Sequence, residues 1–477
     1  MSALWIVEAM AAAMRADKRG ALPVDVSGLS IDTRTIAKGE AFFAIKGGSR
    51  DGHEFVEAAL KAGGGLAVVA RAQAGRFADA PLLIVDDVLE ALRDLARAAR
   101  ARTKAKVIAV TGSVGKTGTK EALRLALSTD GETHASAASY NNHWGVPLSL
   151  ARCPQGTKYA VFEIGMNHAG EITPLTKLVR PHVAIVTTVE PVHLEFFGTV
   201  EKIADAKAEI FLGVEPGGTA VLNRDNAQFS RLEAAAKAAK VSRIVSFGDN
   251  AKADTQLLRV SLQADSSTVE ARVLGTPITY KLGAPGRHIV LNSLGVLTAT
   301  VLAGADLALA ALALGNLRPT PGRGARVTLR VPGGSAVLID ESYNANPASM
   351  AAAIALLGQT PVGGRGRRIA VLGDMLELGP PGAELHRGLA VPLKEANIDL
   401  VYCSGPLMRS LWEALPSNRR GGYADTAAAL EPAVLEALRD GDAIMVKGSL
   451  GSKMGPIVKA LERQFPRAGA LENSSQV

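Results

Sequence analysis

Hydrophobic residues follow two alternating patterns along much of this 477-residue chain. Short continuous apolar runs, such as residues 107–110 and 184–189, are typical of strands that are buried on both faces of a parallel sheet. Other segments, such as 88–102 and 199–212, repeat their apolar residues every three or four positions, which predicts helices. Because strands and helices alternate from residue 106 onward, we expect an α/β protein whose sheets are largely parallel.

The chain is too long for a single hydrophobic core, so we expect several domains. Residues 1–104 are predicted to form an N-terminal α/β domain that ends in a helix with a basic outer face. Residues 105–317 form the expected central domain, where strands and helices alternate. A run of prolines and glycines at 319–324 marks a linker at the start of a C-terminal domain, residues 318–477, which again alternates strands and helices.

The strand predicted at 107–110 runs into a glycine loop with the sequence Thr-Gly-Ser-Val-Gly-Lys-Thr. Glycines let backbone N–H groups approach an anion, and the start of the following helix adds a positive dipole. In such a loop Lys116 reaches the terminal phosphates of a nucleotide, and the Thr117 hydroxyl holds Mg²⁺. An ordinary turn is the alternative, since Val110 stands where the usual loop has its first glycine. The coincidence of strand, glycines, Lys-Thr and helix favours a nucleotide site.

Several polar residues follow predicted strands or turns of the central domain. Glu163 lies near the end of an apolar run, and a buried carboxylate needs a partner that a metal beside the glycine loop would supply. His193 follows the strand at 184–189, where ligands gather in nucleotide-binding sheets, although a lone histidine is usually structural. Asn141 and Asn142 precede a glycine, and two adjacent asparagines taken alone indicate a turn more often than a site.

Lys207 lies in the helix predicted at 199–212, between Ile203 and Phe211 on its apolar face. Its side chain either extends to the rim of that face with its charged end in water, or is held near neutrality by burial. A neutral buried lysine is available for chemistry such as carbamylation by CO₂. The residues alone favour neither interpretation.

The net charge of +7 is compatible with simple solubility or with attraction of anionic substrates. Nucleic acid is not expected as a partner, because lysines and arginines are scattered and aromatic residues make up only 4% of the chain, which leaves few stacking platforms. The two cysteines, Cys153 and Cys403, lie far apart and are expected to be reduced in a cytoplasmic protein. The apolar stretch 294–314 is interrupted by Gly304 and Asp306, which favours two buried helices over a membrane span.

Polar residues near glycines also occur in the outer domains. Ser30, Thr33 and Arg34 lie near a turn that can bind a phosphate, although a plain surface turn explains them equally well. Lys447 and Ser449 flank a glycine in the stretch 447–454 that leads into a predicted helix, and Lys-Gly-Ser at a helix start suits an anion such as a carboxylate.

Six motifs occur in order along the chain. They are Thr-Gly-Ser-Val-Gly-Lys-Thr, Tyr-Asn-Asn-x-x-Gly-Val-Pro-Leu, His-Leu-Glu-Phe-Phe-Gly, Ala-Lys-Ala-Glu-Ile, Ser-Tyr-Asn-Ala-Asn-Pro and Leu-Gly-Asp-Met-x-Glu-Leu-Gly. Together they resemble the Mur ligase family, the ATP-dependent amide-forming enzymes of peptidoglycan precursor synthesis. Within this family the chain is most similar to members that join D-alanyl-D-alanine to UDP-N-acetylmuramoyl-tripeptide.

By this resemblance, the first domain binds the UDP-sugar, the central P-loop ATPase-type domain binds ATP, and the third domain is Rossmann-like and closes over the site. The resemblance also implies a cytoplasmic, monomeric enzyme that makes an acyl phosphate and uses two Mg²⁺ ions and a carbamylated Lys207. The implied catalytic residues are Lys116, His193, Lys207 and Arg323, and the implied metal ligands are Thr117, Glu163, His193 and Lys207.

The resemblance assigns the remaining contacts residue by residue. The implied ATP contacts are Thr111, Gly112, Ser113, Val114, Gly115, Lys116, Thr117, Asn292, Arg323 and Asp340. The implied contacts with the other substrates are Ser30, Thr33, Arg34, Asn141, Asn142, Lys447 and Ser449.

The chain departs from the family pattern at three places. Gly118 replaces a hydroxyl residue, Glu190-Pro191 replaces Asn-Ile, and Leu450 follows Lys-Gly-Ser where Arg is frequent. The alternatives are a sibling Mur ligase that adds diaminopimelate or lysine, a ligase that adds glutamate to folate, and a nucleotide-driven switch without ligation. The Asp-Asn-Pro-Arg motif expected of the diaminopimelate-adding sibling is absent from the sequence.

Overall fold

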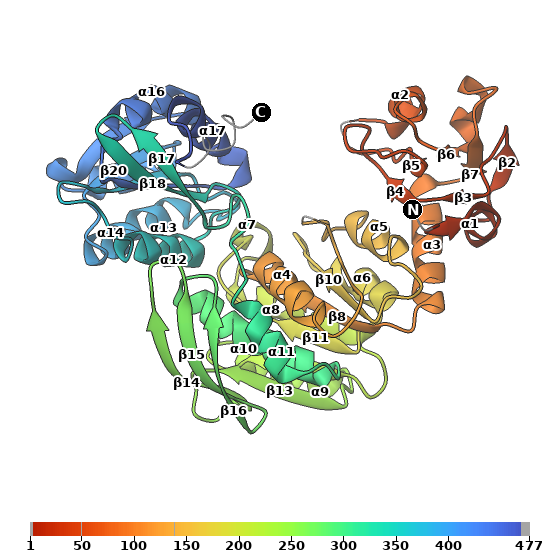
Figure 1. Cartoon of the computed structure of the whole chain (residues 1–477), viewed down its shortest axis with the longest axis horizontal. Coiled ribbons are helices and arrows are strands. Elements are labelled where there is room, and N and C mark those ends of the chain that lie inside the picture. The colour runs from red at the N-terminus through yellow and green to blue at the C-terminus, as the bar shows by residue number, and fades with distance from the viewer. Residues whose placement is uncertain (1–2, 49, 138, 469–477) are drawn as a thin grey trace, which may run out of the picture.

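The computed structural model describes residues 3–48, 50–137 and 139–468, and three large sheets follow one another along the chain. In Figure 1 the first sheet (red to orange) and the third (teal to blue) lie at opposite ends of the molecule, with the central sheet between them. This arrangement confirms the predicted α/β class. The domain boundaries near residues 104 and 317 stay predictions.

The first sheet has five strands, of which β4, β5, β6 and β7 are parallel and β2 is antiparallel. Helix α2 (Val56–Lys61) packs on one face, and α1 (Val7–Met14) and α3 (Val88–Arg102) pack on the other. The bounds of α3 are those predicted. A short ladder of β1 (Trp5–Ile6) and β3 (Asp25–Val26) lies beside α1. The sheet order is β2 (Asp17–Arg19), β7 (Leu82–Val85), β6 (Leu66–Ala70), β5 (Glu40–Phe43) and β4 (Gly28–Ser30).

The central sheet has nine strands. The strands from β14 to β9 run parallel, as expected, but β14, β15 and β16 form an antiparallel meander that the sequence analysis did not predict. The order is β16 (Thr276–Leu282), β15 (Ser267–Val273), β14 (Thr255–Leu262), β13 (Arg243–Gly248), β12 (Thr219–Asn223), β11 (Val183–Val186), β8 (Lys106–Thr111), β10 (Tyr159–Glu163) and β9 (Thr133–Ala135).

Helices cover both faces of the central sheet, which explains why its strands are continuously apolar. Side chains alternate between the faces along β8: Val107 and Ala109 belong to one hydrophobic cluster, and Ile108 and Val110 to another. The first cluster includes residues of α5 (Gly145–Ala151), α6 (Ile172–Val179), α8 (Val200–Ala208) and α9 (Phe229–Ala238). The second includes residues of α4 (Lys116–Leu127), α10 (Arg287–Leu302) and α11 (Leu307–Leu314).

Helices α10 and α11 are the pair predicted from the apolar stretch 294–314, and Gly304 lies in the turn between them with a φ of 87°. The first of these helices begins at Arg287, which places Asn292 in its second turn. Within the described part of the chain, no helix is both long enough and apolar enough to cross a membrane.

The third sheet has six strands, all parallel except for the β17–β18 hairpin. Helices α12 (Pro347–Gly358), α13 (Gly382–Gly388), α14 (Ala390–Glu395) and α15 (Arg409–Ala414) pack on one face, and α16 (Ala427–Ala437) and α17 (Gly455–Gln464) on the other. The order is β17 (Ala325–Val331), β18 (Gly334–Glu341), β22 (Ala443–Lys447), β19 (Arg368–Gly373), β20 (Leu400–Ser404) and β21 (Arg420–Ala424).

Candidate active site

The glycine loop connects β8 to α4, as the sequence predicts. Gly112 has a φ of 148°, and a Cβ atom there would lie 1.9 Å from the Thr187 hydroxyl oxygen, so only glycine fits. Gly115 precedes α4 with a φ of 87°. The Nζ atom of Lys116 folds back over the loop and donates to the Gly112 carbonyl at 2.7 Å. The loop therefore combines tight turns, a helix start and a cation, which are the features of a phosphate site.

Glu163 is buried at the end of β10, where its backbone pairs with Val110 of β8 beside the loop. Its Oε2 accepts a hydrogen bond from Thr117 Oγ1 at 2.9 Å, and its Oε1 accepts one from Asn141 Nδ2 at 2.7 Å. Burial lowers the pKa of the Lys116 ammonium, and the negative charge of Glu163 partly offsets that effect. The carboxylate and the lysine thus stabilise each other at the floor of the site.

A cavity of about 600 Å³ lies above this floor, and both the central and the third domain line it. Its volume is in the range of small-molecule sites. The loop, α4 and α10 form its central-domain side, and the linker and α12 contribute from the third domain. The predicted residues that line it are Ser113, Val114, Gly115, Lys116, Thr117, Asn141, Glu163, His193, Asn292, Arg323 and Lys447.

Lys207 is buried in α8, with only 3% of its surface exposed. The interpretation that its charged end reaches water is therefore wrong. Burial holds the pKa of the Lys207 ammonium well below its usual range, and the charge of Lys116 lowers it further. Burial also lowers the pKa of the His193 imidazole, which feels the charges of both lysines. The structure thus brings His193, Lys116 and Lys207 into one electrostatic neighbourhood.

Arg323 reaches into the cavity from the linker before β17. Its Nη2 donates to the Ser139 hydroxyl of the central domain at 3.3 Å, and its guanidinium lies over the Tyr343 ring at 4.3 Å. Tyr343 follows β18 and lines the same cavity. A planar cation held between a hydroxyl and an aromatic ring is positioned to bind an anion beside the glycine loop, because Ser139 Oγ lies 3.5 Å from Thr117 Oγ1.

Lys447 lines the cavity, but its surroundings differ from those predicted. Its Nζ donates to Glu341 Oε2 at 3.2 Å and to the Asn344 carbonyl at 2.9 Å, so the side chain is already satisfied within the third domain. A helix follows residues 447–454 as predicted, since α17 begins at Gly455. A short 3₁₀ turn at Leu450–Ser452 separates Lys447-Gly448-Ser449 from that helix, so Lys-Gly-Ser does not stand at the helix start itself.

Ser449 is buried and does not belong to the described lining of the cavity. Its Oγ accepts a hydrogen bond from Leu376 N at 3.0 Å and donates to the Ala345 carbonyl at 3.4 Å. The side chain therefore ties two loops of the third domain together.

The remaining predicted residues also lie outside the described cavity lining. Thr111 and Gly112 shape the base of the loop, and Asn142 Oδ1 accepts a hydrogen bond from Gly145 N at the start of α5. Asp340 accepts hydrogen bonds from Gly322 N and from Ser342, and so holds the linker. Ser30, Thr33 and Arg34 belong to the first domain.

The first-domain residues form a local turn rather than a cluster around a cavity. Ser30 is buried and its Oγ accepts a hydrogen bond from Asp32 N, while Arg34 is exposed and forms an ion pair with Asp32 at 2.6 Å. The hydrogen bond from Arg34 lowers the pKa of Asp32 to about 2. Their assignment to the UDP-sugar stays a prediction.

The floor of the cavity suits Mg²⁺ in its chemistry. Thr117 and Glu163 offer the oxygen ligands that Mg²⁺ prefers, and the hydrogen bonds of this buried carboxylate come from a hydroxyl and an amide rather than from a cation. In the part of the chain that the structure describes, no group of three or more His, Cys, Asp or Glu side chains is placed to hold a metal unaided. A metal here would therefore also need phosphate oxygens or further oxygen donors.

Sequence reasoning missed several residues that line the cavity. Among them Tyr343 and Asn344 lie in the predicted loop after β18, and their position at a strand end was a usable signal. His288 lies in the first turn of α10, ahead of the apolar stretch 294–314 from which this helix was predicted. Glu377 reaches His193 from the third domain, and no local pattern indicates that contact.

Three family models match successive parts of the chain. They describe the catalytic domain of the Mur ligase family over residues 25–100, the Mur ligase middle domain over 110–300 and the Mur ligase glutamate ligase domain over 325–450. This chain belongs to the Mur ligase family. The match confirms the resemblance drawn from the six motifs.

Two curated relatives that match this Mur ligase over most of their length carry the same name. A protein of Escherichia coli named UDP-N-acetylmuramoyl-tripeptide–D-alanyl-D-alanine ligase is 35% identical over 443 residues, which are 92% of this chain and 94% of its own. One with the same name from Rickettsia prowazekii is 32% identical over 435 residues, which are 91% of this chain and 95% of its own.

Solved structures agree with this relationship. A crystal structure of MurF from Acinetobacter baumannii has a TM-score of 0.82 and 28% identity, and the match covers 96% of this chain and 99% of that one. MurF from Thermotoga maritima in complex with ADP has a TM-score of 0.74 and 26% identity, covering 92% of this chain and 97% of that one.

Proposed function

We propose that this Mur ligase is a cytoplasmic enzyme that joins D-alanyl-D-alanine to UDP-N-acetylmuramoyl-tripeptide and converts ATP to ADP and phosphate. The names of full-length relatives support this assignment. The observation that carries it is one cavity that is lined both by a phosphate loop and a buried carboxylate of the central domain and by Arg323 of the third domain. A ligase needs nucleotide and acyl acceptor in one water-poor space, and a cavity between two domains provides it.

The chemistry requires activation of a carboxylate, because a carboxylate does not react with an amine at neutral pH. Transfer of the terminal phosphoryl group of ATP to the peptide carboxylate gives an acyl phosphate, and attack by the dipeptide amine then releases phosphate. Lys116 and Arg323 approach the cavity from opposite domains, so both can neutralise charge on the transferred group. The loop glycines leave backbone N–H groups free to hold the other phosphates.

Mg²⁺ bound at this floor would be held by Thr117 and Glu163, with His193 close by, and it would neutralise phosphate charge. Thr117 and Glu163 are already fixed relative to each other at 2.9 Å. Asn141 orients the second carboxylate oxygen of Glu163, which keeps the carboxylate in place. ADP in the Thermotoga maritima relative supports nucleotide binding in this fold.

Lys207 is proposed to act as a carbamate. A depressed pKa favours the neutral amine, which is the form that adds CO₂, and the product is an anion whose charge a nearby metal can neutralise. Its burial beside His193 and Lys116 supports this role. Formate or acetate should restore part of the activity that a Lys207→Ala variant loses, since either supplies the missing carboxylate oxygens.

The first domain is proposed to hold the UDP-sugar through Ser30, Thr33 and Arg34, and residues 1–104, 105–317 and 318–477 are proposed as the functional domains. Asn292 and Asp340 are proposed contacts for the nucleoside end of ATP, and Asn142 for the sugar-peptide. Lys447 and Ser449 are proposed to shape the site of the dipeptide carboxylate. In the structure both are bonded to neighbouring loops, so they act by fixing those loops.

The decisive experiment measures phosphate release by the full-length enzyme with matched amines. D-alanyl-D-alanine with the UDP-tripeptide should support release, whereas D-alanine amide, free diaminopimelate and L-alanyl-L-alanine should do so poorly. An amine that lacks the dipeptide carboxylate, such as D-alanine amide, leaves polar groups of the site unpaired. Release in the presence of ATP alone measures the background.

The outcomes separate the alternatives. Release that needs diaminopimelate or lysine together with a UDP-dipeptide would assign the chain to a sibling Mur ligase. Release with folate and glutamate would assign it to folate chemistry. Release that needs no amine at all would indicate a nucleotide-driven switch.

A further inference from the structure

Two residues with left-handed backbones meet where the central and third domains touch. His193 has a φ of 55° and Glu377 has a φ of 62°, and this backbone conformation is costly for residues other than glycine. The Nδ1 atom of His193 lies 2.5 Å from Glu377 Oε2. Residues in strained backbone conformations persist only where the surrounding structure stabilises them. The contact between His193 and Glu377 is therefore maintained by the structure around it.

The backbones make the same contact. Glu195 N donates to the Glu377 carbonyl at 3.2 Å. Gly379 has a φ of 66°, and a Cβ atom at that position would lie 3.1 Å from the Glu195 Cα. The loop of residues 374–379 between β19 and α13 is therefore seated directly against residues 193–195.

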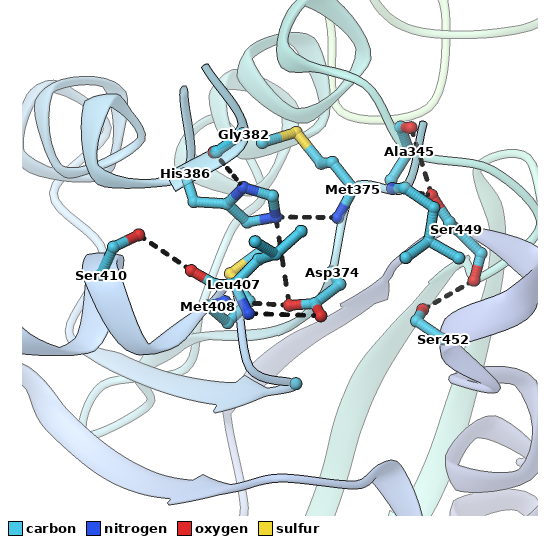
Figure 2. A network of polar contacts seen from close by, with 12 residues as sticks. Ala345, Asp374, Met375, Gly382, His386, Leu407, Met408, Ser410, Ser449 and Ser452 are labelled. Carbon is cyan, nitrogen blue, oxygen red and sulfur yellow. Dashed lines mark hydrogen bonds and ion pairs between the residues drawn. The ribbon is translucent and has the colours of Figure 1, made fainter. Parts of the chain in front are cut away.

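A buried histidine holds one side of this loop in place (Figure 2). His386 accepts a hydrogen bond at Nε2 from Met375 N at 2.9 Å, and its Nδ1 donates to the Gly382 carbonyl at 2.6 Å. The imidazole must be neutral and protonated on Nδ1 to make both bonds. Burial lowers the pKa of His386, which agrees with this assignment.

Other contacts fix the start and the middle of the same loop. The Asp374 carboxylate accepts a hydrogen bond from Met408 N at 2.8 Å, and Leu376 N donates to Ser449 Oγ at 3.0 Å. Figure 2 shows Asp374 and Met375 between His386 and Ser449. Because its base is so constrained, the loop presents Glu377 in one direction.

The Glu377 contact also fixes His193. With Nδ1 bonded to the carboxylate, Nε2 is the nitrogen left for the cavity that His193 lines. A carboxylate on the far nitrogen is the usual device by which proteins orient a metal-binding histidine. Here the carboxylate comes from a different domain than the histidine.

From this geometry we propose that Glu377 is a positioning residue that orients His193 toward the metal–nucleotide site only while the third domain is docked. The proposal rests on the proposed nucleotide and metal site. Its consequence is linkage: the docked third domain strengthens binding of metal and nucleotide, and metal and nucleotide strengthen docking by the same factor.

The test compares full-length wild type with Glu377→Ala, Glu377→Gln and Glu384→Gln. Mn²⁺ is titrated in the presence of a non-hydrolysable ATP analogue, and free Mn²⁺ is measured by electron paramagnetic resonance. Glu377→Ala should weaken Mn²⁺ binding roughly tenfold, the usual effect of losing such an orienting group. Glu377→Gln retains an acceptor oxygen for Nδ1 and should fall between Ala and wild type. Glu384 is an exposed glutamate on α13, and its variant should match the wild type.

Hydrogen exchange supplies a readout of docking that does not depend on activity. Mn²⁺ and the analogue should slow exchange in residues 193–198 and 374–379 of the wild type and of Glu384→Gln, and they should not do so in Glu377→Ala. A purely structural role would instead lower the unfolding midpoint of Glu377→Ala, which should stay unchanged because the side chain is 43% exposed.

Equal Mn²⁺ affinity in all four proteins would overturn the proposal. Tighter binding by Glu377→Ala would also overturn it, since Glu377 would then withhold His193 from the metal. Failure of the enzyme to ligate D-alanyl-D-alanine would count against the proposed function alone, because neither the titration nor the exchange measurement uses that substrate.

Discussion

The first and central domains meet through a continuous hydrophobic core, whereas the central and third domains meet through polar contacts. One cluster runs from Trp5 in the first domain to Ala236 in the central domain. Among the described residues, no hydrophobic cluster joins those before Leu317 to those after it. The third domain instead contacts its neighbour through groups such as Glu377 and Arg326.

The difference follows from what each kind of contact does. Burial of apolar surface is strong and holds two parts together in one arrangement, whereas a few polar contacts can be exchanged with water at little cost. At the first junction Trp5 Nε1 donates to the Ala151 carbonyl, Arg102 lies over the Trp5 ring at 3.4 Å, and Arg152 donates to the Leu29 carbonyl. We infer that the first junction is fixed and that the second can open to admit substrates.

Trp5→Ala should have the largest effect on stability. The side chain is 4% exposed, and its removal leaves a cavity under Arg102, so we expect a loss of roughly 3–5 kcal/mol in the free energy of unfolding. Chemical denaturation followed by circular dichroism measures this loss. Trp5→Phe is the matched control, because it keeps an aromatic ring and loses mainly the bond to Ala151. A cost as small as that of Glu377→Ala would contradict the contrast between the junctions.

Lys116→Ala tests the floor of the cavity at the second junction. The substitution should lower activity rather than stability. Removal of the cation that is proposed to neutralise charge on the transferred phosphoryl group should lower kcat/KM by a factor of about 10²–10³. Thr187 and the loop glycines shape the turn without the lysine side chain, so the unfolding midpoint should change little. Steady-state phosphate release with saturating UDP-tripeptide measures the loss. Near wild-type turnover would show that the nucleotide does not bind at this loop.

Sequence patterns predicted the elements whose residues bury a regular face and missed contacts made between distant elements. Helix α3 has the predicted bounds, because its apolar periodicity ends where burial ends. The meander of β14 to β16 was missed because it turns back through ordinary polar turns rather than through helices. Periodicity reports one element at a time, so it cannot report which loops of two domains touch.

In the candidate site, too, the sequence predicted what depends on one element and missed what depends on contacts between elements. Glu163 was found from the end of its own strand, and its burial follows from that strand's apolar neighbours. The burial of Lys207 could not be decided from its helix, since the packing of α8 against the sheet determines it. Glu377 was part of a quoted motif, yet its partner His193 lies 184 positions away.

Lys207→Met tests the contrast between the two junctions further, because it removes a buried lysine near the second junction. The folded-state pKa of Lys207 is depressed, so between that pKa and the ordinary lysine value of about 10.4 the unfolded state binds a proton that the folded state lacks. Wild-type stability should therefore rise with pH in this window. In CO₂-free buffer the Met variant should be more stable than wild type at pH 7, and the gap should narrow as pH increases. Thermal unfolding midpoints across this range measure it.

Lys202→Met provides the control for this titration. Lys202 lies on the same helix α8 but is exposed, so its variant should track the wild type at every pH. A gap of constant size between wild type and Lys207→Met would show that Lys207 keeps its proton in the folded protein.

Arg326→Met should have the smallest effect on the protein. It tests whether one contact at the second junction stays in place while the rest of the junction opens. Arg326 on β17 donates from Nη1 to the Ala264 carbonyl in the turn between β14 and β15, and from Nη2 to Thr360 Oγ1 at 3.2 Å. Met keeps most of the apolar stem and removes the donors, so we expect a loss of only about 0.5–1.5 kcal/mol in the unfolding of the third domain. Small-angle scattering should show a broader range of particle dimensions in this variant, because the meander no longer holds β17.

Arg330 on the same strand is exposed, and Arg330→Met should leave the scattering profile unchanged. An unchanged profile for Arg326→Met would mean that the linker and the Glu377 contact alone set the position of the third domain.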